Sequence, residues 1–142
     1  MGEMLSKAII IATKAHQGQV DKGGDDYILH PIRVMTKLDT EEERIVGVLH
    51  DIIEDTDVTF EDLKVEGFST EVISALEHLT RGKNEKYFDY IERIKMNSMA
   101  KKVKLVDLED NMDISRIQNP TKKDYDRLKK YKKAKDRLTK NN

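Results

Sequence analysis

The sequence contains no cysteine, which excludes disulfide bridges and thiolate metal ligands and permits a reducing compartment. Glycine and proline are scarce, with 7 and 2 residues among 142, so sandwiches and barrels rich in tight turns are disfavoured. No apolar run is long enough to cross a membrane, and residues 1–19 lack the pattern of a signal peptide. These absences favour a cytoplasmic protein without a membrane partner.

Helical periodicity is present along most of the chain. The expected helices cover about residues 3–18, 31–37, 40–49, a segment from 59, 69–80, 87–95, 99–117 and 121–138. Thr40 with Glu43, and Thr59 with Asp62, have the spacing of capping boxes. No segment alternates like a strand. We therefore expect an all-α fold with residues 1–142 in one domain, a length sufficient for one core.

Charge is distributed unevenly along the sequence. Residues 121–142 contain 10 Lys/Arg and 3 Asp/Glu, whereas the rest contains 16 Lys/Arg and 24 Asp/Glu. A basic segment can bind nucleic acid. Its apolar residues, however, recur at helical spacing: Tyr125, Leu128, Tyr131 and Leu138. We interpret the segment as an amphipathic helix packed on the domain, with nucleic-acid binding as the minor alternative.

Histidine and aspartate in three separate segments suggest a metal site. His30 precedes a proline, His50 and Asp51 follow an apolar helix, and Asp107 follows "VKLV". Imidazole together with carboxylate suits Zn²⁺, Mn²⁺, Fe²⁺ or Co²⁺. The alternative is an acidic helix end without a ligand.

The segment "LHDIIEDTD" (residues 49–57) also holds further acidic residues. Asp51 and Asp55 would share a helical face, and Asp57 is expected to be a helix cap. The remaining histidines, His16 and His78, are interpreted as structural residues.

Three motifs occur in order: "HP" at 30–31, "HDIIED" at 50–55 and "VKLVDLEDNM" at 103–112. With the preceding "AHQGQVDKGGDDYILHP", they resemble the HD-domain metal-dependent phosphohydrolases. The closer resemblance is to the hydrolase domain of the RelA/SpoT family and its small stand-alone relatives. It extends over roughly residues 5–116 and implies an HD-domain helical bundle.

The resemblance implies a role for each matching residue. The four metal-ligand positions, where alarmone hydrolases usually hold Mn²⁺, correspond to His30, His50, Asp51 and Asp107. The acidic pair that positions or activates water corresponds to Glu54 and Asp55, and the positions lining the substrate pocket correspond to Lys22 and Asn111. The implied reaction is hydrolysis of the 3′-pyrophosphate of guanosine 3′,5′-bis(diphosphate), a nucleotide of the stringent response.

Two positions depart from the family pattern. Asp21 stands where alarmone hydrolases carry an Arg that packs on guanine, and Ile114 stands where they carry Thr. Two alternatives therefore stay open. One is an enzyme that hydrolyses another nucleotide or a phosphorylated metabolite, and the other is a metal- and nucleotide-binding module without turnover.

Overall fold

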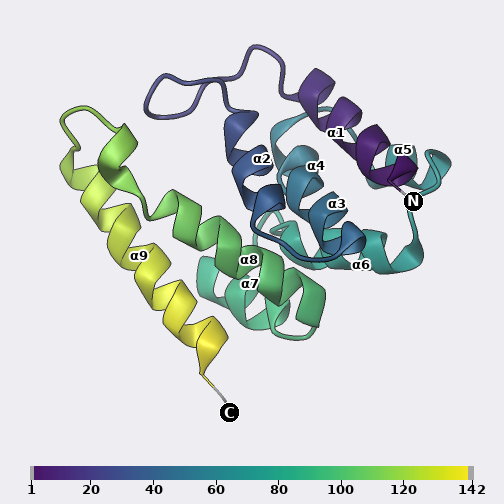
Figure 1. The fold of residues 1–142 in the computed structure, drawn as a ribbon. Helices are drawn as coiled ribbons and strands as arrows, with labels where there is room; N and C mark the ends of the chain where they lie inside the picture. The colour runs from purple at the N-terminus through teal and green to yellow at the C-terminus, as the bar shows by residue number, and fades with distance from the viewer. Residues whose placement is uncertain (1, 141–142) are drawn as a thin grey trace.

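The computed structural model describes residues 2–140, and these residues form helices joined by loops (Figure 1). The α-helices are α1 (Glu3–Ala15), α2 (Leu29–Thr36), α3 (Glu41–Leu49), α4 (Ile52–Asp55), α5 (Phe60–Val65), α6 (Thr70–Leu79), α7 (Tyr87–Ile94), α8 (Ser98–Asn111) and α9 (Lys122–Thr139). A 3₁₀ turn, η1, covers Ile114–Arg116. Within residues 2–140 the only β-type pairing is one isolated bridge between Val20 and Asp26. The predicted all-α fold is confirmed.

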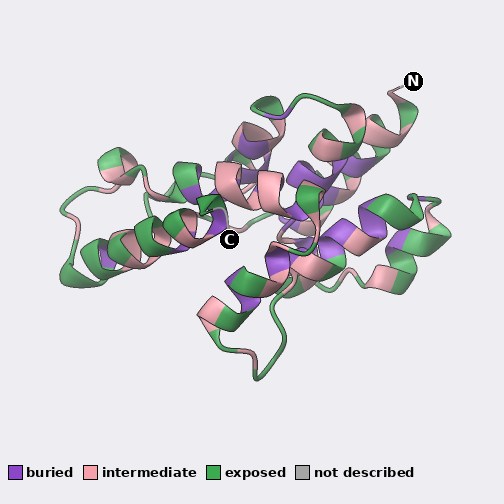
Figure 2. Cartoon of the chain, turned by 90° about the horizontal axis from the view of Figure 1, so that it is seen from below, coloured by how far each residue is buried: buried purple, intermediate pink, exposed green. Residues whose placement is uncertain are grey.

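The centre of the core is α3. Its residues from Ile45 to Leu49 are all buried, which is the pattern of a helix enclosed by others. It packs against α1, α2, α6 and α8. Figure 2 shows buried positions along the inner faces of the helices and exposed positions on the loops. Because α3 is held on several sides, the residues that follow its C-terminus are fixed close to α2 and α8.

The start of α3 follows from its cap. The Thr40 side chain accepts a hydrogen bond from the backbone N–H of Glu43, and the Glu43 carboxylate accepts one from the backbone N–H of Thr40, so the predicted capping box is confirmed. The same reciprocal pair forms between Thr59 and Asp62 at the start of α5.

The basic C-terminal helix packs on the fold as predicted. Helix α9 lies against α7 and α8, and its Ala134 and Leu138 are fully buried. Tyr125 is 48% exposed, so it does not belong to the packed face, and the prediction was wrong for this residue.

Two predicted helix ends were wrong. The helix expected over residues 99–117 stops at Asn111, because the Asp113 side chain accepts hydrogen bonds from Ser115 and stabilises the separate turn η1. The helix expected over residues 3–18 stops at Ala15, and the chain then turns through Gly18, which has a positive φ of 86°.

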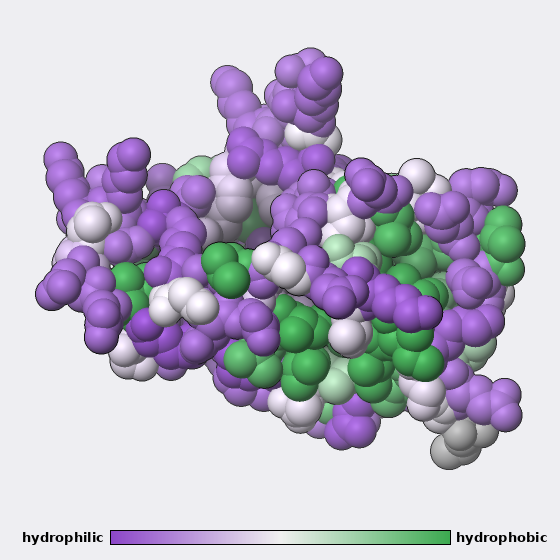
Figure 3. Space-filling model, turned by 90° about the horizontal axis from the view of Figure 1, so that it is seen from above, coloured by the Kyte–Doolittle hydropathy of each residue, from purple (hydrophilic) through white to green (hydrophobic). Residues whose placement is uncertain are grey.

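On the face seen from above, apolar surface gathers in one main region and hydrophilic side chains cover most of the remaining area (Figure 3). Exposed large apolar side chains among the described residues include Ile10 on α1 and Val20 in the loop after it. In the part of the chain that the structure describes, no helix combines the length and the apolarity needed to traverse a bilayer.

Candidate metal centre

Four residues predicted as metal ligands come together from distant parts of the chain. His30 lies on α2, His50 and Asp51 lie between α3 and α4, and Asp107 lies on α8. One possible ligand atom from each of these residues falls within 4.8 Å of the others. The His30, His50 and Asp107 side chains are at most 5% exposed, and Asp51 is 20% exposed.

Both imidazoles are oriented by a hydrogen bond at Nδ1. His30 Nδ1 donates to Asp110 Oδ2 at 2.6 Å, and His50 Nδ1 donates to the carbonyl oxygen of Gly47 at 2.6 Å. These bonds leave Nε2 of each ring directed at the carboxylates. His30 Nε2 lies 2.8 Å from Asp107 Oδ1, and His50 Nε2 lies 3.0 Å from Asp51 Oδ2. An Nδ1 partner that fixes the ring is a common feature of metal-binding histidines, so the donor set fits a divalent cation.

Further side chains hold the two carboxylates in place. Lys104 Nζ donates to Asp107 Oδ2 at 2.9 Å, and Asn111 Nδ2 donates to Asp107 Oδ1 at 3.1 Å. The Tyr27 hydroxyl donates to Asp51 Oδ2. Tyr27 therefore packs beside the cluster as a hydrogen-bond donor.

The electrostatics of the cluster follow from burial and from the facing charges. Burial lowers the pKa of His50, but Asp51 and Asp107 outweigh it and hold that pKa well above its usual value. Burial raises the pKa of Asp107, but Lys104 and His50 outweigh it and hold that pKa well below its usual value. The cluster thus keeps its carboxylates ionised, which is the state that binds a cation.

The local backbone explains how two adjacent residues reach one site. Helix α3 ends at Leu49, and Asp51 has φ −101° and ψ 0° before α4 begins. This break turns His50 and Asp51 towards the same point. Asp51 and Asp55 were predicted to share a helical face, and the backbone N–H of Asp55 donates to the carbonyl of Asp51 at 3.0 Å, as in a helical turn.

Glu54 and Asp55 lie on α4 at the exposed rim of the cluster. Neither carboxylate hydrogen-bonds to the four cluster residues, and Glu54 Oε1 accepts the backbone N–H of Arg81. Partial loss of hydration raises the pKa of both carboxyls, and the Asp51 charge adds to this effect.

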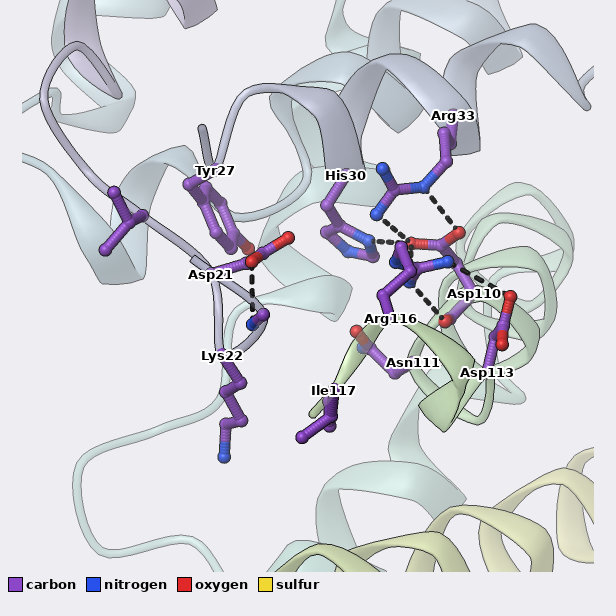
Figure 4. Close-up of a pocket in the computed structure, with 12 residues that line it drawn as sticks. Asp21, Lys22, Tyr27, His30, Arg33, Asp110, Asn111, Asp113, Arg116 and Ile117 are labelled. Atoms are coloured by element: carbon purple, nitrogen blue, oxygen red, sulfur yellow. Dashed lines mark hydrogen bonds and ion pairs between the residues drawn. The ribbon is translucent and has the colours of Figure 1, made fainter. Parts of the chain in front are cut away.

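A cavity of about 310 Å³ lies beside the cluster (Figure 4). His30, Lys22 and Asn111 line it, together with Asp21, Arg116 and Ile117. Asn111 therefore connects the cavity to Asp107. Lys22 is exposed on the loop before α2, and its side chain extends away from Asp21 in Figure 4.

Three other sequence interpretations have clear outcomes. His16 is structural, because it is 1% exposed and its Nδ1 bonds to Gln19 Oε1 at 2.9 Å. His78 Nδ1 donates to the carbonyl of Ser74 within α6. Asp57 was wrongly interpreted as a cap, since Thr59 caps α5.

The sequence analysis missed Asp110 and Lys104. Asp110 is 2% exposed and accepts hydrogen bonds from both His30 and Arg33, which fixes α2 against α8. Both residues lie three positions from Asp107, so their spacing on the predicted helix was the available signal.

No family model matches the chain. A GTP pyrophosphokinase of Myxococcus xanthus is 40% identical over 83 residues, which are 56% of this chain and 11% of that protein. A guanosine-3′,5′-bis(diphosphate) 3′-pyrophosphohydrolase of Aquifex aeolicus is 33% identical over 120 residues, which are 78% of this chain and 17% of that protein. The chain thus spans less than a fifth of the length of these curated relatives.

Among solved structures, a metazoan ortholog of SpoT that hydrolyses ppGpp aligns with a TM-score of 0.81 and 25% identity. The alignment covers 99% of this chain and 88% of that one. In sequence and in fold, this chain is similar to the hydrolase domain of the RelA/SpoT family. The resemblance predicted from the three motifs is confirmed, and the SpoT-like chain has the helical fold of a hydrolase over nearly its whole length.

Proposed function

We propose that this SpoT-like chain is a cation-dependent phosphohydrolase that removes the 3′-pyrophosphate of guanosine 3′,5′-bis(diphosphate). The observation that carries the proposal is the convergence of two imidazoles and two carboxylates within 4.8 Å. The cavity beside them supports it, because a nucleotide would have room there. The activities named for the Aquifex relative and the metazoan ortholog support this choice of substrate.

His30, His50, Asp51 and Asp107 would hold one divalent cation, which we propose to be Mn²⁺. Mixed nitrogen and oxygen donors suit Mn²⁺ among the transition metals, and the absence of thiolates fits this choice. When bound, the cation would neutralise phosphoryl charge and make water more acidic.

The chain's own carboxylates would handle the water. We assign this role to Glu54 and Asp55, because their raised pKa values make them better proton acceptors than ordinary surface carboxylates. The water oxygen forms a bond to the phosphorus nearest the ribose, and the bond from that phosphorus to the 3′-oxygen breaks. One water proton passes to the acidic pair, and the departing 3′-oxygen takes up a proton from the protonated pair or from solvent. The products are GDP, or GTP from the pentaphosphate, and pyrophosphate.

Two further residues would contact the substrate. Lys22 at the cavity edge would meet a phosphate as a point charge. Asn111 already donates to Asp107, so its amide oxygen remains to accept a hydrogen bond from the nucleotide. We also infer that residues 1–142 form one domain. The continuous core, which includes residues from α1 to α9, supports this inference.

The experiment is hydrolysis of a nucleotide panel by the purified chain with Mn²⁺ and, separately, with a chelator. Glu54→Gln keeps the size of the side chain and removes its basicity. It should lower kcat by about 10²- to 10⁴-fold, the usual contribution of a general base. His50→Ala should abolish the dependence on Mn²⁺.

Glu61→Gln is the matched control, because Glu61 is an exposed residue of α5 without a hydrogen bond or an ion pair among the described side chains. It should leave kcat unchanged. Equal rates in the wild type, Glu54→Gln and His50→Ala would contradict a hydrolase. Cleavage of other nucleotides without cleavage of guanosine 3′,5′-bis(diphosphate) would contradict only the assignment of the substrate.

A further inference from the structure

We propose that Asp21 selects the base of the bound nucleotide and that it favours guanine over adenine. This proposal rests on the proposed function, since it places a nucleotide in the cavity beside the cluster. His30 lines that cavity and also directs its Nε2 at the metal cluster. A ligand with phosphate at the cluster would therefore have its nucleoside in the cavity, where Asp21 is part of the wall.

Most charged groups around the cavity are already paired. Arg33 donates to Asp110 through two nitrogens, and Arg116 donates to Asp113 at 3.1 Å. Each of these charges is thus largely satisfied inside the protein. A ligand in the cavity must therefore be recognised mainly by polar groups that have no partner inside the protein.

Asp21 offers such a free group. Its Oδ1 accepts the backbone N–H of Gly23 at 2.8 Å and that of Asp25 at 3.0 Å. No described residue donates to Oδ2, and Asp21 forms no ion pair within residues 2–140. Because its own turn fixes one oxygen, the carboxylate is held in a single orientation. Figure 4 shows it directed towards the space beside Tyr27, away from the Lys22 side chain.

The chemistry of a carboxylate oxygen determines which base it can bind. An ionised carboxylate only accepts hydrogen bonds. Guanine presents two adjacent donors on one edge, N1–H and the N2 amino group. Adenine presents the N6 amino group beside N1, whose lone pair would face the carboxylate. Val20 and Ile117 give the same cavity apolar walls against which a flat ring can pack.

Asp21→Asn tests this assignment without disturbing the loop. The turn supplies two N–H donors, so the Asn oxygen must stay at the Oδ1 position and the amino group must replace Oδ2. A donor would then face guanine N1–H and could instead bind adenine N1. Asp25→Asn is the matched control, because it removes the same charge from an exposed side chain of the same loop that does not line the cavity.

The measurement is the equilibrium binding of GDP and ADP by calorimetry, with saturating Mn²⁺. The wild type should bind GDP about 10- to 100-fold more tightly than ADP, the range expected for a hydrogen bond to a charged group. Asp21→Asn should lose or reverse this preference, and Asp25→Asn should keep it. Equal affinities for GDP and ADP in the wild type, or an unchanged preference in Asp21→Asn, would overturn the proposal. Binding does not require turnover, so a failure of base selection is distinguishable from a failure of the hydrolase assignment.

Discussion

Asp107 is the residue on which the cluster converges. Its Oδ1 contacts the Nε2 atoms of His30 and His50 and the amide of Asn111, and its Oδ2 accepts from Lys104. A single carboxylate therefore links α2, the α3–α4 turn and two further positions of α8. Replacement of Asp107 by Glu would lengthen the side chain by one methylene group, displace the carboxylate and break these contacts.

At the same scale, Asp110 should control the affinity for the cation. It accepts from His30 Nδ1 and fixes the ring, although it is outside the four-residue cluster. Asp110→Asn should weaken Mn²⁺ binding by about 10- to 100-fold, as is typical when the partner of a ligand histidine is changed. Calorimetric titration with Mn²⁺ measures the change. The control is Asp113→Asn, which removes an exposed carboxylate three residues later, beyond the end of α8. An Asp110→Asn variant with wild-type affinity would contradict this role.

At the scale of elements, the connection between α6 and α7 depends on one ion pair. Arg93 on α7 donates to both oxygens of Glu85, at 2.8 and 2.9 Å, and to the carbonyl of Thr80 just after α6. Hydrogen bonds from Arg93 and from the backbone of Gly82 lower the pKa of Glu85 to about 2. The charged carboxylate therefore stabilises this connection.

Glu85→Gln should lower the free energy of unfolding by up to about 1 kcal/mol at pH 7, the usual range for a partly exposed pair. A lowered pKa stabilises the fold above the ordinary Glu value of 4.5, and the contribution is lost as the pH falls towards 2. Urea unfolding from pH 7 to pH 3 should show the wild type and Glu85→Gln converging. Glu71→Gln, an exposed position of α6 that forms no ion pair within residues 2–140, is the control. A difference that is constant over this pH range would refute the assignment.

The helices also show which features of the structure could be predicted from the sequence. Helix starts with a side-chain cap, such as those at Thr40 and Ser69, were predictable because the cap is local. The end of α8 was not, because the turn at Asp113 competes with helical periodicity that continues through Ile117. The four-residue cluster was predicted from its resemblance to a family. Asp110 was missed, since its role arises only when α2 packs on α8.

At the scale of the whole molecule, cation binding should stabilise the fold. The ligand residues come from α2, the α3–α4 turn and α8, so they are assembled only in the folded chain. Mn²⁺ at about 100 times its Kd should add roughly 2.7 kcal/mol. Removal by a chelator should lower Tm by about 5–10 °C in a chain of this size.

Thermal unfolding followed by circular dichroism measures this shift. Asp51→Asn should abolish the difference between chelated and Mn²⁺-loaded protein. His78→Asn should keep it, because the His78 side chain donates to the carbonyl of Ser74 within α6 and is not part of the cluster. The same shift in the Asp51→Asn variant as in the wild type would show that the cation binds elsewhere.

The ammonium of Lys104 contributes to the net charge of the four-residue cluster. Asp51 and Asp107 contribute two negative charges, and the Lys104 side chain, 13% exposed, contributes one positive charge beside them. Before any ion enters, the raised pKa of His50 keeps that imidazole protonated, so these charges sum to about zero; a bound dication displaces the proton and brings the sum to about +1. Only the state with the bound dication carries the net positive charge that attracts phosphates. Binding should consequently be ordered, with the metal ion entering before the nucleotide.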